Sequence, residues 1–158
     1  MLYTALLISR GVPAFINSAP ESDYEGRAAY DVGIGYPEDP IDLHDVKIDY
    51  EAHRTKNLFV ELKSILHTSA STFVYFVPMF KSMSIISLRV QFLAECVDAM
   101  DQVNRGDGTF VVRKRYRMVG GGDQGERNPG ILLPIDVAER NSVPFWEMVK
   151  TLKQQVQV

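Results

Sequence analysis

Residues 71–80 read STFVYFVPMF, and this short apolar stretch decides the fold. Five strand-favouring residues follow one another without interruption, namely Phe73, Val74, Tyr75, Phe76 and Val77. β-Branched and aromatic side chains favour strands, and the run is too short for a helix and too apolar for a surface loop. Pro78 then marks its end, since proline cannot donate to a ladder of strand hydrogen bonds. The stretch therefore predicts a buried strand.

The segments that precede this strand predict two more strands and a helix. Residues 2–9 are aliphatic and stop at Arg10 and Gly11, as expected of a buried strand. Residues 43–51 alternate apolar and polar side chains, as in a strand with one wet face. Residues 56–68 have apolar side chains at helical spacing, and Thr55 stands where an N-cap belongs.

The segments that follow predict a core helix, a hairpin and a closing helix. Residues 84–104 carry a broad apolar stripe and predict the main core helix. Residues 109–119 and 131–137 predict two strands of a long hairpin. Five glycines between them, within residues 120–130, predict a flexible loop, because glycine-rich chain is costly to order and supplies no apolar anchor. An amphipathic helix then begins near Asn141.

Together these elements predict one α+β domain that spans residues 1–158. Its core is expected to be a mixed or antiparallel sheet of about five strands packed against two or three helices, with the long hairpin in the C-terminal half. A chain of this length buries about two-thirds of the surface that its unfolded form exposes, so one core is sufficient.

Composition excludes several classes of protein. The formal net charge of −3 opposes binding to nucleic acid or anionic lipid over the whole surface, so such binding needs a local basic patch. The single cysteine, Cys96, cannot form an internal disulfide and lies among apolar residues, which fits a reducing compartment. We expect a cytoplasmic protein with no signal peptide, membrane anchor or cofactor. The three histidines lack the spacing of a zinc cluster, so no bound metal is expected either.

The clearest basic patch is the segment from Thr109 to Met118. If it is a strand, Arg113, Arg115 and Arg117 share one face, because side chains alternate along a strand. Three interpretations are open: a solvated face, a surface that binds a protein partner, or a row of guanidinium groups that follows a nucleic-acid backbone. Arg127, near the tip of the predicted loop, would add a further contact.

A second motif is the segment from Leu58 to Lys63, with Asp42, Asp45 and Asp49 upstream of it. Its hydrophobic Glu61-x-Lys63 pattern resembles the corresponding strand of the PD-(D/E)xK nuclease superfamily. The resemblance implies that an upstream acid, here Asp49, and Glu61 hold a divalent metal while Lys63 helps to activate water or stabilise charge on phosphate. The helical spacing of the same residues favours an ordinary amphipathic helix instead.

These observations favour a non-enzymatic assembly or interaction module that uses a basic hairpin and a mobile loop. Such a module could be a subunit of a larger oligomeric or virion-like assembly, with self-association or a protein partner expected. Two alternatives remain: a metal-dependent nuclease that uses Asp49, Glu61 and Lys63, and a nucleic-acid-binding module without cleavage. Whether Glu61 and Lys63 lie on a strand or on a helix distinguishes these alternatives best.

Overall fold

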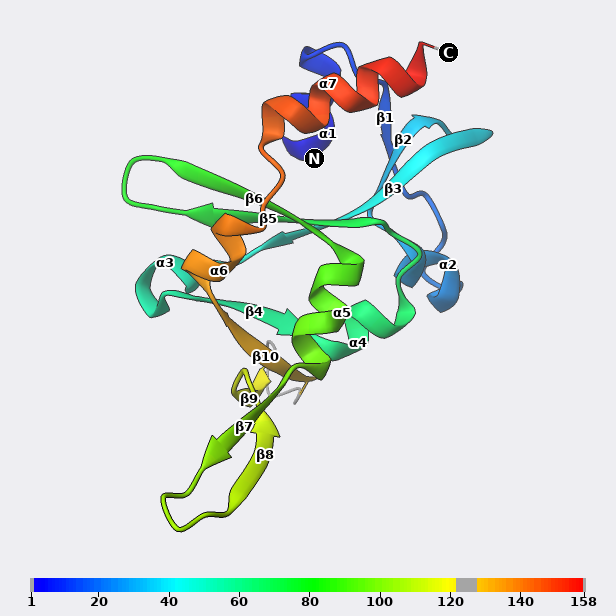
Figure 1. Cartoon of the computed structure of the whole chain (residues 1–158). Helices are drawn as coiled ribbons and strands as arrows, with labels where there is room; N and C mark the ends of the chain where they lie inside the picture. The colour runs from blue at the N-terminus through cyan, green and yellow to red at the C-terminus, as the bar shows by residue number, and fades with distance from the viewer. Residues whose placement is uncertain (1, 122–127, 158) are drawn as a thin grey trace.

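The central sheet is built around the apolar stretch quoted first. The structure is a computed structural model that describes residues 2–121 and 128–157. In it the predicted strand is confirmed as β5, Thr72–Pro78, inside a five-stranded sheet of order β1-β2-β3-β5-β6 (Figure 1). The other strands are β1, Ala14–Ile16; β2, Val32–Tyr36; β3, Asp39–Ile48; and β6, Met83–Arg89. β3 and β5 run parallel and the remaining neighbours antiparallel, so the predicted α+β class with a mixed sheet is confirmed.

β5 divides the hydrophobic core into two clusters, one on each face of the sheet. Phe73, Tyr75 and Val77 point into one cluster. Val74 and Phe76 point into the other. Side chains alternate between the two faces of a strand, so a strand with an unbroken apolar run, here from Phe73 to Val77, is covered on both sides.

One face of the sheet is covered by the first and last helices. These are α1, Leu2–Ser9, and α7, Phe145–Val156, which confirms the closing helix. The prediction of a strand at residues 2–9 is wrong. Tyr3 and Leu7, one helical turn apart, are both fully buried in the cluster that also contains Met148. A short apolar run does not by itself distinguish a buried helix from a buried strand.

The other face is covered by a second sheet and several short helices. The second sheet has the order β4-β10-β9, with β4 at Asn57–Glu61, β9 at Met118–Gly121 and β10 at Asn128–Pro134. The helices are α3, Ala52–Thr55; α4, Leu62–His67; α5, Val90–Asp98; and α6, Ile135–Arg140. A further helix, α2 at Tyr24–Ala29, precedes β2. Nowhere in residues 2–121 and 128–157 is a helix both long and apolar enough to cross a membrane.

The predicted helix at 56–68 is wrong in its first half. Residues 57–61 form β4, and only 62–67 are helical. Leu58 and Val60 are fully buried and lie opposite Leu133 and Ile131 of β10. This pairing with a distant strand overrides the local helical pattern. Thr55, predicted as an N-cap, is instead the last residue of α3.

The predicted core helix at 84–104 is also wrong, because the structure divides it into three elements. They are β6, the shorter helix α5, and β7 at Met100–Asn104. Ile86 and Leu88 have helical spacing relative to later apolar residues, but they are buried in a strand that pairs with β5 along its whole length. The sequence pattern alone does not reveal that residues 83–89 pair with the edge of β5 that β3 leaves free.

The predicted long hairpin is present only in part. Residues 109–119 do not form one strand: β8, Phe110–Lys114, pairs with β7, and β9 pairs with β10. Of the predicted flexible loop, residues 120–121 belong to β9 and 128–130 to β10, whereas 122–127 lie outside the described residues. The return strand predicted at 131–137 ends at Pro134, where α6 begins.

Candidate functional site

Two adjoining cavities open on the face of the main sheet that carries β4 and α4. The smaller, about 220 Å³, is lined by residues of α2, β3, β4 and α4 and includes Asp31 and Asp45. The larger, about 670 Å³, is lined in part by Phe59, Phe73 and Tyr75. The wall between the cavities is formed by side chains that line both, namely Lys47, Glu61 and Ser64.

The smaller cavity brings together two carboxylates that are 14 positions apart. Asp31 immediately precedes β2, and the antiparallel pairing of Val32 with His44 places it beside Asp45 of β3. The backbone N–H of Val46 donates a 2.8 Å hydrogen bond to Asp31 Oδ2, which holds this carboxylate against β3. A carboxylate fixed by backbone geometry keeps its position when a ligand arrives.

Asp45 is the more buried of the two acids, with only 5% of the residue exposed. The hydroxyl of Thr68 donates a hydrogen bond to Asp45 Oδ2. Burial, reinforced by the negative charge of Asp31, raises the pKa of Asp45 to about 6, although Thr68 and Lys47 partly oppose the rise. Burial disfavours the ionised form of a carboxyl group, and so does a neighbouring carboxylate. A cation bound between these acids would offset both the cost of burying the ionised carboxylate and its repulsion by the neighbouring one.

Lys47 follows Asp45 by two positions on β3 and therefore lies on the same face of the strand. Its Nζ donates a 3.2 Å hydrogen bond to Ser64 Oγ, and Ser64 Oγ lies 3.4 Å from Glu61 Oε1, to which it can donate. Ser64 thus connects the ammonium group of Lys47 to the carboxylate of Glu61. This bridge orients Lys47 across the wall between the cavities.

The three residues that sequence analysis selected for nuclease chemistry do not all line one cavity: Asp49 and Glu61 line the larger cavity, and Glu61 and Lys63 line the smaller one. Asp49 is a structural residue: its Oδ1 accepts the N–H groups of Glu51 and Ala52 at the start of α3, and its Oδ2 accepts that of Phe59. Glu61 is the last residue of β4 and Lys63 lies in α4, so the Glu61-x-Lys63 pattern spans a strand end and a helix.

Lys63 nevertheless lines the smaller cavity, where its ammonium group lies 5.4 Å from the centre of the Tyr24 ring. The same acid-x-lysine spacing occurs a second time in the chain, at Asp45 and Lys47. Here it does lie on a strand, and Asp31 supplies the upstream acid. The signal was present in the sequence, within the alternating segment at 43–51.

The acids of the smaller cavity suit a magnesium ion that also binds water and phosphate. They do not suit a metal ion whose ligands all come from the protein. In the part of the chain that the structure describes, no three His, Cys, Asp or Glu side chains group to hold a metal. Magnesium, however, usually binds to one or two carboxylates and completes its shell with water and substrate phosphate. Asp31 and Asp45 supply two carboxylates, and the site opens to a cavity that could admit a phosphate.

The predicted row of arginines is broken. Arg113 lies in β8, whereas Arg115 and Arg117 lie in the bend between β8 and β9. Arg115 Nε donates a 2.8 Å hydrogen bond to Asp101 Oδ1 of β7, and this bond and the charge of Asp101 raise the pKa of the guanidinium. Arg127 lies outside the described residues. Arg113, Arg115 and Arg117 therefore do not share one strand face, because only Arg113 lies in a strand and the other two follow it in the bend.

A second polar cluster lies on the opposite face of the sheet and is largely buried, although the Asp42 side chain is 20% exposed. His44 is fully buried, with Nδ1 2.7 Å from the Tyr3 hydroxyl and Nε2 2.9 Å from Asp42 Oδ2. Burial raises the pKa of Tyr3 above its usual range. Burial also raises the pKa of Cys96, whose thiol is buried on α5 as expected. Because Tyr3, His44 and Cys96 are buried, a substrate cannot reach them, and we assign them structural roles.

Comparisons with known proteins add no candidate: no family model, no curated protein and no solved structure matches the chain. The assignment of function therefore rests on the geometry of the cavity.

Proposed function

We propose that the protein is a divalent-metal-dependent nuclease whose catalytic residues are Asp31, Asp45 and Lys47. The observation that carries this proposal is the environment of the Asp45 carboxyl group, which is buried and has a raised pKa. Asp31 and Lys47 line the same open cavity. The pair of acids, Asp31 and Asp45, is costly to ionise without a cation. Both carboxylates line the same open cavity, where a metal ion and a phosphate group could reach them.

Each residue has a distinct part in phosphodiester hydrolysis. Asp31 and Asp45 would hold a magnesium ion, which polarises a phosphoryl oxygen and lowers the pKa of water. Lys47, oriented by Ser64, would stabilise the negative charge that develops on the phosphate. The oxygen of water forms a new bond to phosphorus, the bond from phosphorus to the leaving oxygen breaks, and the proton of water ends on that oxygen.

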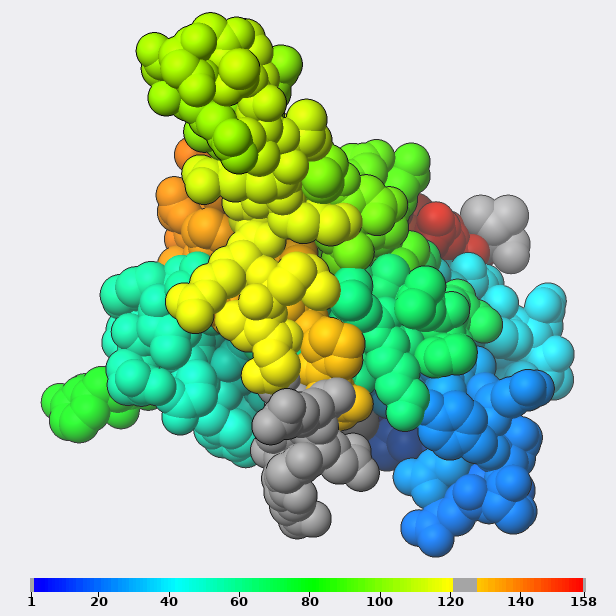
Figure 2. All heavy atoms as spheres, turned by 90° about the horizontal axis from the view of Figure 1, so that it is seen from below, coloured from blue at the N-terminus to red at the C-terminus, as the bar shows by residue number. Residues whose placement is uncertain are grey.

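Nucleic acid is the phosphodiester that best fits the surroundings of this cavity. The larger cavity shares a wall with it and, at about 670 Å³, lies in the range that holds small organic ligands. Among its aromatic residues, Tyr50 is exposed and Phe59 is half-buried, and their rings could accept a nucleotide unit next to the phosphate that is cut. Figure 2 shows that α2 and α4, which line the smaller cavity, share a face of the molecule with a projecting basic hairpin.

Cleavage of labelled DNA and RNA in the presence of Mg²⁺ or Mn²⁺ tests the proposal. We expect the wild type to cleave nucleic acid and a chelator to abolish this cleavage. Asp45→Asn and Lys47→Met should each lower the cleavage rate at least about 100-fold, because removal of one group that stabilises charge in the transition state has an effect of this size. The control is Asp39→Asn, which makes the same chemical change at an exposed position of β3 and should leave cleavage intact. Absence of cleavage with either metal, or equal cleavage by Asp45→Asn, would overturn the proposal.

The assembly module predicted from sequence remains a second candidate because of one observation. The hairpin formed by β7 and β8 exposes apolar side chains: Met100, Phe110 and Val112 are 46%, 56% and 62% exposed. Exposed apolar patches often mark interfaces. Light scattering of the wild type across the micromolar range tests this candidate, and a strictly monomeric protein would contradict it.

A further inference from the structure

The hairpin of β7 and β8, called here the β7–β8 hairpin, extends away from the rest of the molecule (Figure 1). Its two strands form a two-stranded sheet of their own, joined by residues 105–109. An isolated hairpin is at best marginally stable in water, so a protein that projects one gains little stability from it. Its position suggests that it contacts something outside the chain.

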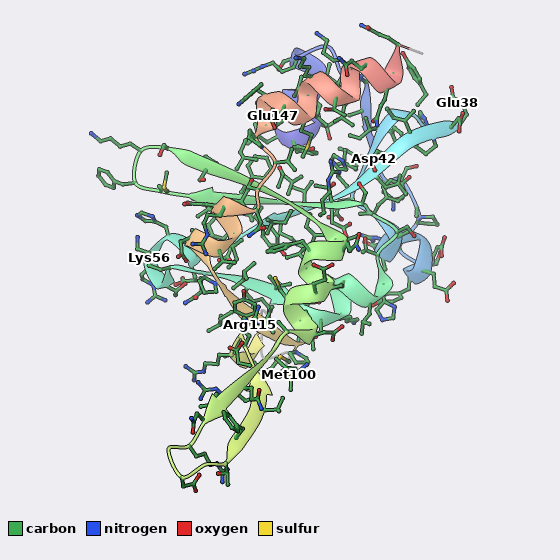
Figure 3. All side chains as sticks on the ribbon, viewed as in Figure 1. Glu38, Asp42, Lys56, Met100, Arg115 and Glu147 are labelled. Atoms are coloured by element: carbon green, nitrogen blue, oxygen red, sulfur yellow. The ribbon has the colours of Figure 1, made fainter. Side chains whose placement is uncertain are left out.

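The root of the hairpin is fixed to the body. The ion pair of Arg115 with Asp101 of β7, and the 2.9 Å hydrogen bond from the Arg115 backbone N–H to Ala99 O, join the two arms of the hairpin where they leave the body. Lys114 Nζ donates a 3.1 Å hydrogen bond to Val97 O at the end of α5. Met100 and Arg115 mark this root in Figure 3. A ribbon held at its root presents its outer part in a defined direction.

The hairpin and the bend after it form a local basic region in an acidic protein. Residues 100–117 contain four arginines and one lysine but only two acidic residues, although the whole chain has a net charge of −3. Within the described residues, Arg105, Arg113 and Arg117 make no side-chain hydrogen bond or ion pair. Unpaired guanidinium groups on a projecting ribbon are complementary to phosphate.

One face of the hairpin carries side chains suited to the edges of base pairs. Residues directly opposite in an antiparallel pair share a face, so Gln102 lies beside Val112 and Asn104 beside Phe110. All four are exposed. Amide side chains can bind adenine in the major groove, and apolar side chains can contact the methyl group of thymine. On the opposite face Asp101, Val103 and Val111 are half-buried, whereas Arg113 is exposed.

We propose that the β7–β8 hairpin inserts into the major groove of B-form duplex DNA, with Arg105, Arg113 and Arg117 on the flanking phosphates. The major groove is about 12 Å wide and admits a two-stranded ribbon, whereas the major groove of duplex RNA is too deep and narrow for side chains to read. The inference deepens the nuclease proposal by naming its substrate. It rests on that proposal for cleavage but not for binding.

Fluorescence anisotropy with chelator present measures binding while preventing metal-dependent cleavage. The probes are one sequence as duplex DNA, single-stranded DNA and duplex RNA, each titrated from 50 to 200 mM salt. We expect the duplex DNA to bind at least about tenfold more tightly than the other two, with log K falling by about three per log unit of salt if three phosphates are neutralised. Arg113→Ala should reduce that slope by about one.

Phe110→Ala should weaken duplex binding severalfold without changing the salt slope, because it removes a contact that carries no charge. The control is Lys150→Ala on α7, at the end of the molecule away from the hairpin (Figure 1), and it should change neither quantity. Unchanged thermal melting of the hairpin variants verifies folding.

The outcomes separate the two proposals. Duplex binding that depends on Arg113, without cleavage when Mg²⁺ or Mn²⁺ is added, supports the hairpin inference and removes the nuclease. Cleavage that Arg113→Ala and Phe110→Ala leave unchanged supports the nuclease and overturns the hairpin inference. The inference is also overturned by tighter binding of single-stranded DNA or duplex RNA, or by self-association that Phe110→Ala abolishes.

Discussion

Replacing Asp45 with asparagine should stabilise the protein at neutral pH while abolishing the proposed cleavage of nucleic acid. Asp45 has a pKa of about 6 in the folded protein against an ordinary value of 3.8. The folded state therefore binds the proton more tightly than the unfolded state, so the stability associated with Asp45 is fully present below pH 3.8 and is lost as the pH rises through 6.

The size of this effect follows from the shift. Each pKa unit corresponds to about 1.4 kcal/mol, so the ionised Asp45 costs the folded state about 3 kcal/mol at pH 7.5. At pH 4.5 the same linkage leaves a cost of about 1 kcal/mol, so the wild type should lose about 2 kcal/mol relative to Asp45→Asn between these pH values. The asparagine is neutral throughout, and its carbonyl oxygen can still accept the hydrogen bond from Thr68.

Urea unfolding of the wild type and Asp45→Asn at pH 4.5, 6 and 7.5 measures this difference directly. Because both proteins share every other titrating group, subtracting their free energies of unfolding isolates Asp45. Asp39→Asn serves as the control and should parallel the wild type. A pH-independent difference, or an Asp45→Asn protein that is less stable than the wild type at pH 7.5, would refute the assignment of Asp45 as a destabilised carboxyl group.

Further substitutions test the core, the structural role of Asp49 and the packing of the second sheet. Leu93→Ala on α5 should cost about 2 to 5 kcal/mol of unfolding free energy in urea, since Leu93 is fully buried; a loss below 1 kcal/mol would contradict its place in the core. Asp49→Ala should lower the free energy of unfolding by about 1 to 3 kcal/mol, because it leaves backbone N–H groups unpaired. Cleavage per folded molecule should persist, and its loss would indicate that Asp49 takes part in catalysis. Gly130→Ala should lower the melting temperature strongly, because a Cβ there would lie 2.4 Å from Val60 O, whereas Gly120→Ala, with no atom within 4 Å of its Cβ, should not; equal melting would refute this packing.

Sequence analysis identified the central strand, the half-exposed strand and the closing helix because each has a strong local pattern. β5 is apolar from Phe73 to Pro78, and apolar and polar side chains alternate from Val46 to Tyr50. The face of β3 expected to be wet is not fully so, because Asp45 is buried. Sequence analysis failed at residues 84–104, where apolar residues are so frequent that they satisfy strand and helix periods at once. The choice there depends on pairing with β5, which a local window does not contain.

The candidate site shows the same limit. The acid-x-lysine spacing occurs at Asp45 and again at Glu61, and sequence analysis selected the copy at Glu61 because the apolar run before it is the more conspicuous. What identifies Asp45 is its neighbour Asp31, and their proximity depends on the register of β2 against β3. That register includes a bulge between Ile34 and Gly35, where Gly35 has a φ of 96°, and nothing in a linear motif specifies it.

The packing of α1 against α7 has a consequence for synthesis on the ribosome. The Tyr3 hydroxyl donates a 3.3 Å hydrogen bond to Met148 Sδ, across 145 positions of the chain. Residues of α1 are made first, but the cluster that receives them also needs Met148, Val149 and Leu152 of α7. That face of the sheet consequently stays open to chaperones and to other nascent chains until α7 has left the exit tunnel. The opposite face, with the cavities, needs no residue of α7, because its buried cluster is complete with α6.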